Sequence, residues 1–377
     1  MQFASDDAVM LRALELAARG FGSVEPNPQV GAVIVTPDRR LIAEGWHVRP
    51  GGPHAEIHAI HAASGQTRGA DIFITLEPCS HHGRTPPCVD ALLAAGFRRV
   101  VVGCVDPAPH ASGRGLQILR QAGLHVDIGV CQTAAEMLIA PFARQILRRL
   151  PWVHAKWAMS LDGRIATDSG HSQWISAVES RQAVHQLRGR VEAILTGAGT
   201  VRVDNPQLTA RPPGPRTPVR VVFDSAGQSL SARSQLAQTI NDAPLLVCVS
   251  ERCSSSDQMR LRELGAEVFM GSGAGAINPR EVLEELGRRG MTHVLLEAGP
   301  RLLGCFFDQR LVDEVHIFVA PKFLGGQAAA SAVAGRGVSQ VPAMAQLQAM
   351  RVRQIGPDVL IEGKIDRNTD PAGLDVA

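Results

Sequence analysis

Residues 77–88 read EPCSHHGRTPPC, a loop rich in proline and histidine that follows a strand-like run and ends where a helical pattern begins. Upstream, residues 53–56 read PHAE at the start of another helical pattern. Together these stretches supply one histidine, His54, and two cysteines, Cys79 and Cys88. Zinc prefers imidazole and thiolate ligands, and a catalytic zinc keeps one position open for water. The pattern therefore predicts a zinc site in the first half of the chain.

Glu56 lies two residues after His54, and this spacing gives it a separate role. Side chains two apart on a helix point in different directions, so Glu56 can avoid the metal and face the bound water. A carboxylate in that place can carry protons between water and a leaving amine, as in zinc deaminases with a His-x-Glu motif. The sequence thus predicts hydrolytic deamination, with Glu56 as the catalytic proton shuttle.

Alternative uses of the same residues are a metalloprotease and a structural zinc site. The His-Glu-x-x-His motif of metalloproteases is absent, because Ala55 separates His54 from Glu56. A structural site would need a fourth protein ligand, which His81 or His82 could supply. That interpretation makes the chain a binding module and leaves Glu56 without a role. The eight residues between the two cysteines also exceed the spacing of the short deaminase motif.

The composition is that of an ordinary globular protein, with 45% hydrophobic and 20% charged residues. A length of 377 residues suits two domains. The net charge of +2 and the absence of Tyr disfavour a nucleic-acid partner, which would need a basic, aromatic surface. The seven cysteines do not suggest a disulfide framework. No signal peptide or membrane-spanning run is visible, so we expect a cytoplasmic protein with no membrane partner.

Short β-type runs alternate with helical patterns along both halves, which predicts an α/β fold in each. A helical pattern over residues 132–149, ended by Pro151, would bridge the halves. The predicted domains are therefore residues 1–150 and 151–377. The predicted strands are 30–35, 41–46, 71–76, 99–105 and 126–130 in the first domain, and 153–159, 193–196, 219–224, 245–249, 293–297 and 314–319 in the second.

The loop of residues 77–88, together with the run PNPQVGAVIV at residues 26–35, resembles the deaminase half of the bifunctional deaminase/reductase family of riboflavin biosynthesis. The resemblance implies a cytidine-deaminase-like α/β/α sandwich followed by a dihydrofolate-reductase-like α/β domain, in a homo-oligomer (dimer or tetramer). It implies that His54, Cys79 and Cys88 hold Zn²⁺. The implied small-molecule substrate is 2,5-diamino-6-ribosylamino-4(3H)-pyrimidinone 5′-phosphate, in which water replaces the exocyclic amine and ammonia leaves.

Two positions qualify this resemblance. Asn27 matches a position that contacts the ring in related deaminases, although capping the turn before a strand is nearly as good an explanation. Ala108, within the run DPAP at residues 106–109, stands where the family usually has Asn. This departure affects a contact of the loop and not the chemistry.

The second half carries weaker signals of its own. Residues 196–200 (TGAGT) and 296–300 (LEAGP) place glycine after a strand, where the backbone could approach a phosphate. Neither fits the Gly-x-Gly-x-x-Gly fingerprint of a Rossmann site. Arg188 and Arg211 are candidates for gripping a sugar phosphate, although a single Arg is more often a solvated surface residue.

Residues 156–166 (KWAMSLDGRIA), residues 172–175 (SQWI) and the run from Thr196 to Arg211 resemble the reductase half of the same family. The implied reaction is hydride transfer from NADPH to the ribosyl C1′, which opens the sugar and gives 5-amino-6-ribitylamino-uracil 5′-phosphate. The arginines would bind the phosphate, and Lys156 would be a further contact near the sugar. Ala298 replaces the first of two glycines usual after the Glu and could crowd the cofactor turn. The implied NADPH-lining residues are Ala158, Trp174, Thr200, Asp204, Ser225 and Gly299, and the implied substrate-binding residues are Ser172, Arg188, Leu208, Arg211 and Glu297.

The main alternative among enzymes is a nucleic-acid deaminase of the tRNA type, with the same zinc fold and an accessory domain. The modest charge and the sparse aromatic residues disfavour it. Tight, salt-dependent RNA binding would support it.

Overall fold

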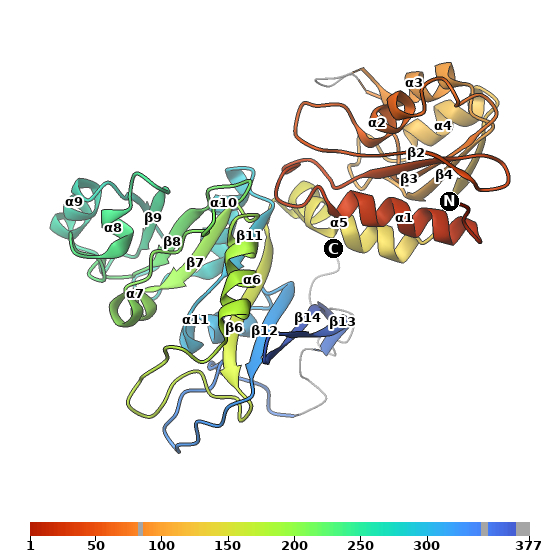
Figure 1. Ribbon diagram of the computed structural model, residues 1–377. Helices are drawn as coiled ribbons and strands as arrows, with labels where there is room; N and C mark the ends of the chain where they lie inside the picture. The colour runs from red at the N-terminus through yellow and green to blue at the C-terminus, as the bar shows by residue number, and fades with distance from the viewer. Residues whose placement is uncertain (82–85, 341–345, 367–377) are drawn as a thin grey trace. The chain divides into compact units, whose positions relative to one another are not determined.

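The computed structural model describes residues 1–81, 86–340 and 346–366 of the chain. The chain divides into two compact units, Met1–Arg149 and Leu150–Ala377. Each unit is built on its own β-sheet (Figure 1). Among the described residues, no helix combines the length and the apolar character that crossing a membrane requires.

A five-stranded mixed sheet forms the centre of the first unit, counted over the described residues. Its strands are β1 (Gly31–Val35), β2 (Leu41–Trp46), β3 (Asp71–Leu76), β4 (Arg99–Cys104) and β5 (His125–Ile128). Their spatial order is β2-β1-β3-β4-β5. Strand β1 is antiparallel to β2 and β3, whereas β3, β4 and β5 run parallel. Both β1 and β3 are buried along their whole length, as expected for strands covered on both faces.

Helices cover both faces of this sheet, so the first unit is the α/β/α sandwich that the sequence predicts (Figure 1). Side chains alternate between the two faces along each strand. Ile72 and Ile74 of β3 pack in one core, whereas Phe73 packs in the other. One layer contains α2 (Ala55–Ala62), α3 (Cys88–Ala95) and α4 (Arg114–Gln121), and the other contains α1 (Asp6–Ala18) and α5 (Gln132–Arg148).

Gly45 of β2 lets the start of α2 lie directly on the sheet. A Cβ atom added to Gly45 would lie 2.5 Å from the carbonyl oxygen of Ala55 and 2.5 Å from the amide nitrogen of Ala59. Contacts this short do not occur between a real Cβ and backbone. Because Ala55 begins α2, the glycine determines how closely His54 and Glu56 approach the sheet.

A nine-stranded sheet, counted over the described residues, forms the second unit. Its strands are β6 (Trp152–Ser160), β7 (Ala193–Gly197), β8 (Val219–Phe223), β9 (Leu245–Val249), β10 (Glu267–Met270), β11 (His293–Leu296), β12 (Glu314–Ala320), β13 (Gln346–Ile355) and β14 (Asp358–Asp366). Their spatial order is β10-β9-β8-β7-β11-β6-β12-β14-β13. Strands β6 to β12 run parallel, and β14 is antiparallel to β12 and β13.

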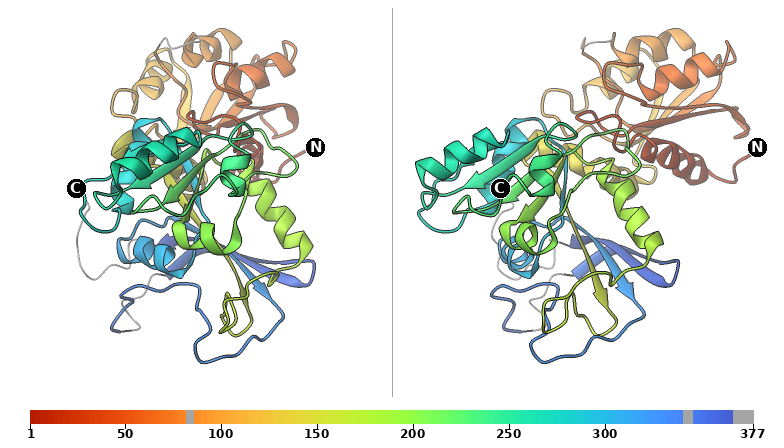
Figure 2. Two further views of the ribbon diagram at one scale, coloured as in Figure 1. Left: turned by 90° about the vertical axis from the view of Figure 1, so that its left-hand side faces the viewer. Right: turned by 60° about the vertical axis from the view of Figure 1, so that its left-hand side comes forward.

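Helices also cover both faces of the parallel strands in the second unit, as the two views of Figure 2 show. Val153 and Ala155 of β6 face the larger core, whereas Phe318 of β12 packs against Val184 on the opposite face. This arrangement is the α/β fold that the sequence pattern predicts, and it agrees with the dihydrofolate-reductase-like domain that the family resemblance implies. The helices are α6 (Val178–Arg188), α7 (Ala198–Asp204), α8 (Gln235–Gln238), α9 (Ser255–Glu263), α10 (Pro279–Arg288) and α11 (Pro300–Asp308).

Strand β11 lies between β7 and β6, although it follows both of them in the chain. The connections therefore diverge on the two sides of β11, and such a switch point leaves a crevice at the carboxyl ends of the strands. The turn that follows β11 lies against β7, because the amide of Glu297 donates a hydrogen bond to the carbonyl of Leu195 at 2.9 Å. A ligand site is expected at this edge of the sheet.

Candidate active sites

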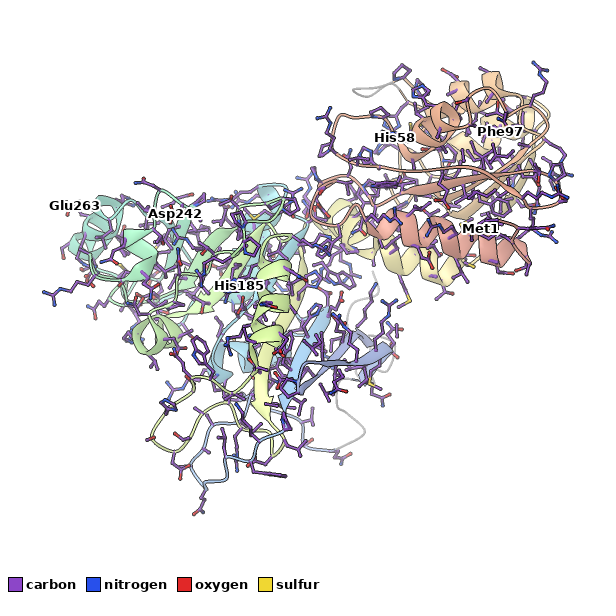
Figure 3. All side chains as sticks on the ribbon, in the orientation of Figure 1. Met1, His58, Phe97, His185, Asp242 and Glu263 are labelled. Carbon is purple, nitrogen blue, oxygen red and sulfur yellow. The ribbon has the colours of Figure 1, made fainter. Side chains whose placement is uncertain are left out.

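The three predicted zinc ligands come together in the first unit, at the starts of two helices. His54 immediately precedes α2, and Cys88 is the first residue of α3. Cys79 lies in the loop that follows β3. Figure 3 labels His58 on α2, one turn beyond this cluster. The N-termini of two helices therefore lie at the cluster, where their dipoles favour thiolate over thiol.

The spacing of the ligand atoms fits zinc. Nδ1 of His54 lies 3.1 Å from Sγ of Cys88 and 3.6 Å from Sγ of Cys79. All three ligand atoms lie within 4.8 Å of one another. In a tetrahedral zinc site, the usual bond lengths separate nitrogen and sulfur ligands by about 3.5 Å. The three side chains thus have the chemistry and the spacing that zinc requires.

Interactions within the cluster already favour the ionised form of one thiol. A hydrogen bond from Cys88 lowers the pKa of Cys79 to about 4 despite the opposing effect of burial, and His54 contributes to this shift. The same contact raises the pKa of Cys88, so the two sulfurs share one proton. A hydrogen bond with Cys79 raises the pKa of His54. Zinc binding displaces these protons, because the metal takes thiolates and neutral imidazole.

Glu56 is buried beside the ligands, with 3% of its surface exposed. Its Oε2 atom is buried and has no hydrogen-bond partner among the residues that the structure describes. Burial raises the pKa of Glu56, and the neighbouring His54 partly opposes this effect. Buried carboxyl oxygens normally have partners. An unpaired one beside a metal site is suited to accept a proton from water.

Glu77 and His47, which the sequence pattern did not mark as functional, hold the ligand loops in place. The Glu77 carboxylate accepts hydrogen bonds from the amides of Gly113 at 2.8 Å and Gly115 at 2.9 Å. It thereby connects the end of β3 to the N-terminus of α4. His47 lies 3.0 Å through Nδ1 from the carbonyl oxygen of Pro53, directly before the first ligand. The position of Glu77 before Pro-Cys is a signal in the sequence, whereas His47 has none.

The two positions that qualify the family resemblance have local contacts. Nδ2 of Asn27 lies 3.0 Å from Nε2 of His47, so Asn27 belongs to the same supporting network. Ala108 is buried, with 3% of its surface exposed, and its amide donates to Oδ1 of Asp106 at 2.8 Å. The small side chain therefore fills a packed position in this loop.

His81 does not join the metal-ligand cluster found among the described residues. Its ring instead lies beside that of His110, with 5.5 Å between the centroids. His82, the other candidate for a fourth protein ligand, lies outside the described residues. The described ligand set is therefore one histidine and two cysteines, which leaves a fourth position for water.

In the second unit, Arg188 and Glu297 form a bidentate ion pair. Nε of Arg188 lies 2.6 Å from Oε1 of Glu297, and Nη2 lies 2.9 Å from Oε2. Nζ of Lys156 lies 3.7 Å from the same Oε2. These side chains are 15%, 10% and 16% exposed in that order. Three sequence-predicted residues from α6, β6 and the turn after β11 thus form one nearly buried cluster.

This cluster carries two positive charges and one negative charge. Burial alone would raise the pKa of Glu297, but Arg188 and Lys156 outweigh burial and lower it to about 2. Burial lowers the pKa of Lys156, and Glu297 opposes that shift. With Glu297 ionised, the local excess of positive charge favours an anionic ligand at this edge of the sheet.

The loop of residues 207–211 places Arg211 close to Arg188. The Arg211 guanidinium contacts the side chains of Gln207 and Thr209, and Oγ1 of Thr209 is 2.9 Å away. Nη1 of Arg188 donates to the carbonyl of Thr209 at 3.4 Å. Burial and the charge of Arg188 lower the pKa of Arg211. Leu208 is 3% exposed with a φ of 54°, so a ligand would meet its backbone rather than its side chain.

Two further pairs of predicted residues are adjacent. A Cβ atom added to Gly299, which caps α11, would lie 3.7 Å from Oγ1 of Thr200. Oγ of Ser172 donates to Oδ1 of Asp204 at 3.3 Å. The turns after β7 and β11 are therefore close enough to line one surface.

The remaining predicted cofactor residues make local contacts. The carbonyl of Ser225 accepts hydrogen bonds from the amide and the hydroxyl of Ser250, both at 3.1 Å. Trp174 is 64% exposed, and the guanidinium of Arg181 lies 4.8 Å from its ring centroid. Ala158 packs on the core under α6, and Ala298 packs on the larger core. Among the described residues, the Arg188–Glu297 pair makes no hydrogen bond to Ala158, Ala298 or Ser225, so the structure does not join these three positions to that cluster.

Two protein-family models match the chain. The model of the cytidine and deoxycytidylate deaminase zinc-binding region matches residues 4–104, which include the three zinc ligands and Glu56. The model of the RibD C-terminal domain matches residues 151–361. The two matches follow the order of the two units.

Relatives that contain both the deaminase and the reductase domain are similar to this chain along nearly their full length. The riboflavin biosynthesis protein RibD of Synechocystis is 39% identical over 97% of this chain and 98% of its own, and that of Escherichia coli is 37% identical over 94% and 98%. The solved structure of Acinetobacter baumannii RibD has a TM-score of 0.81 at 35% identity, covering 96% of this chain and 99% of its own. The diaminohydroxyphosphoribosylaminopyrimidine deaminase/5-amino-6-(5-phosphoribosylamino)uracil reductase of Thermotoga maritima has a TM-score of 0.80 at 35% identity, covering 96% and 98%. The chain therefore belongs to the RibD family, the bifunctional deaminase/reductases of riboflavin biosynthesis.

Proposed function

We propose that the first unit removes the exocyclic amine of 2,5-diamino-6-ribosylamino-4(3H)-pyrimidinone 5′-phosphate by hydrolysis. The second unit then reduces the ribosyl group with NADPH to give 5-amino-6-ribitylamino-uracil 5′-phosphate. The observation that carries the proposal is the buried, unpaired Oε2 of Glu56 beside one histidine and two cysteines at zinc spacing. The name of the Thermotoga maritima relative, which states these two activities, supports the choice of substrate.

In the deaminase site, His54, Cys79 and Cys88 hold zinc, and Glu56 moves the protons. Zinc with an open position lowers the pKa of a coordinated water toward neutrality. Glu56 takes a proton at Oε2, because that atom has no competing partner in the described part of the protein. It then gives the proton to the leaving amine, and burial supports this step because a raised pKa makes the carboxyl a better acid and base near neutral pH.

In the reductase site, the protein positions two molecules and excludes water. NADPH supplies a hydride for C1′ of the ribosyl group. The turns at Thr200 and Gly299 receive the cofactor, and α11 begins at the second of them. The remaining cofactor contacts that we propose are Ala158, Trp174, Asp204 and Ser225.

The substrate phosphate lies at the two arginines. Arg211 offers its guanidinium from the loop, whereas Arg188 has two of its nitrogens on Glu297 and donates from Nη1 to the carbonyl of Thr209. Arg211 is therefore the main phosphate ligand, and Arg188 adds charge and holds Glu297. The rest of the substrate contacts Ser172, Glu297 and the backbone of Leu208, and Lys156 lies near the sugar.

We also expect the protein to form a homo-oligomer, either a dimer or a tetramer. Light scattering measures this state.

The test mixes zinc-loaded protein, NADPH and the diaminopyrimidine substrate, and records ammonia release and NADPH oxidation together. The proposal expects ammonia first and NADPH oxidation second, because deamination makes the substrate of the reductase. Arg211→Ala should slow only the second signal, and Glu56→Gln should abolish the first. NADPH oxidation that precedes ammonia release would reverse the proposed order. Absence of both signals in the folded, zinc-loaded protein would overturn the substrate assignment.

A further inference from the structure

Three histidines lie side by side on neighbouring strands of the second unit, near the strands' amino ends. His293 begins β11, His154 lies in β6, and His316 lies in β12. They are 4%, 4% and 8% exposed in that order. His154 is paired in register with Glu314 of β12, which places this carboxylate in the same group. None of these residues contributes to either of the two sites described above.

Three side chains of this group have the spacing of metal ligands. Nδ1 of His154 lies 3.3 Å from Nε2 of His316. The Glu314 carboxylate lies 3.6 Å from the first nitrogen through Oε2 and 3.7 Å from the second through Oε1. Ligands at the usual nitrogen and oxygen distances from tetrahedral zinc are about 3.3 Å apart. His154, Glu314 and His316 each offer one ligand atom, and these atoms lie within 4.8 Å of one another, which is close enough to share one metal ion.

The ring nitrogens that do not face the proposed metal, and the Glu314 carboxylate, have the hydrogen-bond partners that are usual around metal ligands. Nδ1 of His316 lies 3.0 Å from Oε1 of Glu362, and Nε2 of His154 lies 3.0 Å from Nδ1 of His293. Nε1 of Trp152 donates to Oε2 of Glu314 at 3.2 Å. Such second contacts fix the ring tautomers and orient the carboxylate toward a metal.

His316 directs a ring nitrogen into the middle of this group. When His316 donates from Nδ1 to Glu362, a neutral ring leaves a lone pair on Nε2. That lone pair lies 3.3 Å from Nδ1 of His154 and 3.7 Å from Oε1 of Glu314, so it can accept a proton from His154 or bind a metal held by all three side chains. The cations near this group include Lys364, which acts on Glu314, and Arg353, whose Nε lies 3.3 Å from Oε2 of Glu362.

We propose that His154, Glu314 and His316 form a second zinc site, separate from the cysteine-containing site of the deaminase unit. Two imidazoles and one carboxylate are a ligand set that zinc takes, with water in the fourth position, whereas Mg²⁺ and Ca²⁺ prefer oxygen ligands alone. The metal links β6 to β12 at a point two residues before Lys156 on the same face of β6. It therefore secures the strand that carries a residue of the reductase cluster.

Zinc content of the full-length protein tests this proposal without any variant. After exhaustive loading and removal of loosely held metal, the wild-type chain should retain two zinc ions. Glu314→Gln, which keeps a hydrogen-bond acceptor for Trp152, and His316→Gln should each retain one. The matched controls are Glu263→Gln and His125→Gln, at exposed positions elsewhere, and both should retain two. A single zinc in the wild type, or two in both cluster variants, would overturn the proposal.

Cobalt substitution assigns each metal to its site. Two thiolates in the deaminase site give an intense sulfur-to-cobalt charge-transfer band, whereas nitrogen and oxygen ligands give only weaker d–d bands. Glu314→Gln should therefore lose one equivalent of cobalt and keep the full charge-transfer intensity. Cys88→Ser should bind one cobalt with d–d bands and little charge transfer. If every bound cobalt shows thiolate ligation, the histidine group instead holds a shared proton and the proposal fails.

Discussion

Arg188 holds Glu297 through two parallel hydrogen bonds of 2.6 and 2.9 Å, across 109 positions of the sequence. The planar fork of an arginine matches a carboxylate in this way, and two of its nitrogens are then unavailable to another anion. The pair fixes the end of α6 against the turn after β11. Glu297 consequently remains ionised at this edge of the sheet. We propose that Arg211, on the neighbouring loop, contributes most to binding the phosphate.

Replacing Glu297 by Gln should destabilise the second unit and disable the reductase. The change leaves the charges of Arg188 and Lys156 nearly buried without their counter-charge, which typically costs about 3 to 5 kcal/mol. Chemical denaturation followed by tryptophan fluorescence measures the loss, and deamination by the same preparation is the control. Stability within about 1 kcal/mol of the wild type would contradict the structural importance of the pair.

The pH dependence of this stability difference follows from the lowered pKa of Glu297. Its pKa falls from the ordinary 4.5 to about 2, so the folded state favours the carboxylate. The contribution is fully present above pH 4.5 and is lost as the pH falls through about 2. The difference in unfolding free energy between wild type and Glu297→Gln should therefore shrink as the pH falls between those values. A difference that is constant over this range would show that Glu297 is not an ionised partner.

The zinc ligands and the fold of the first unit could be predicted because their signals are local. Cys79 and Cys88 lie in one proline-rich loop, and Glu56 follows His54 in one helical pattern. The central strands of both units could be predicted because they are buried on both faces. Their sequences are therefore short, continuous apolar runs, and these runs alternate with helical patterns along the chain. The resemblance to the family then predicted both reactions, which full-length relatives support.

Other features depend on contacts that the sequence does not encode locally. The sequence analysis does not predict the hairpin of β13 and β14, because β13 is exposed along most of its length and its apolar alternation is interrupted where the pairing shifts between Gln348 and Arg351. Glu77 binds amides 36 and 38 positions away. Nothing near Arg188 in the sequence indicates that its guanidinium forms an ion pair with Glu297. His154 and His316 resemble isolated strand residues until the sheet register brings them together.

Glu56→Gln should abolish deamination while zinc content stays unchanged. The amide keeps the shape of the side chain but cannot accept and deliver a proton, and such general acid–base groups contribute about 10²- to 10⁴-fold to rates. Ammonia release and zinc content measured on one preparation separate the two roles. The reductase, given the deaminated intermediate, should proceed at the wild-type rate. Loss of one zinc in this variant would mean that Glu56 supports the metal instead of moving protons.

Arg211→Ala should raise the reductase KM for the phosphorylated intermediate by about 10- to 100-fold, the range expected when a charge-assisted contact is removed. The value of kcat should change much less, because the phosphate is remote from C1′. The dephosphorylated intermediate provides the control, since wild type and variant should use it equally poorly. If the variant impairs both forms of the substrate to the same degree, Arg211 does not bind the phosphate.

Gly45→Ala should damage the deaminase through the position of α2. The added methyl group would lie 2.5 Å from the backbone of Ala55 and Ala59, so the helix must shift. Overpacking of this kind typically costs about 1 to 3 kcal/mol, and here it also displaces His54 and Glu56. We expect weaker zinc retention and slower ammonia release, with reduction of the intermediate preserved. The matched control is Gly275→Ala, where an added Cβ meets nothing within 4 Å. If Gly45→Ala has wild-type deamination and zinc affinity, the close approach of α2 to β2 is not what places the catalytic residues.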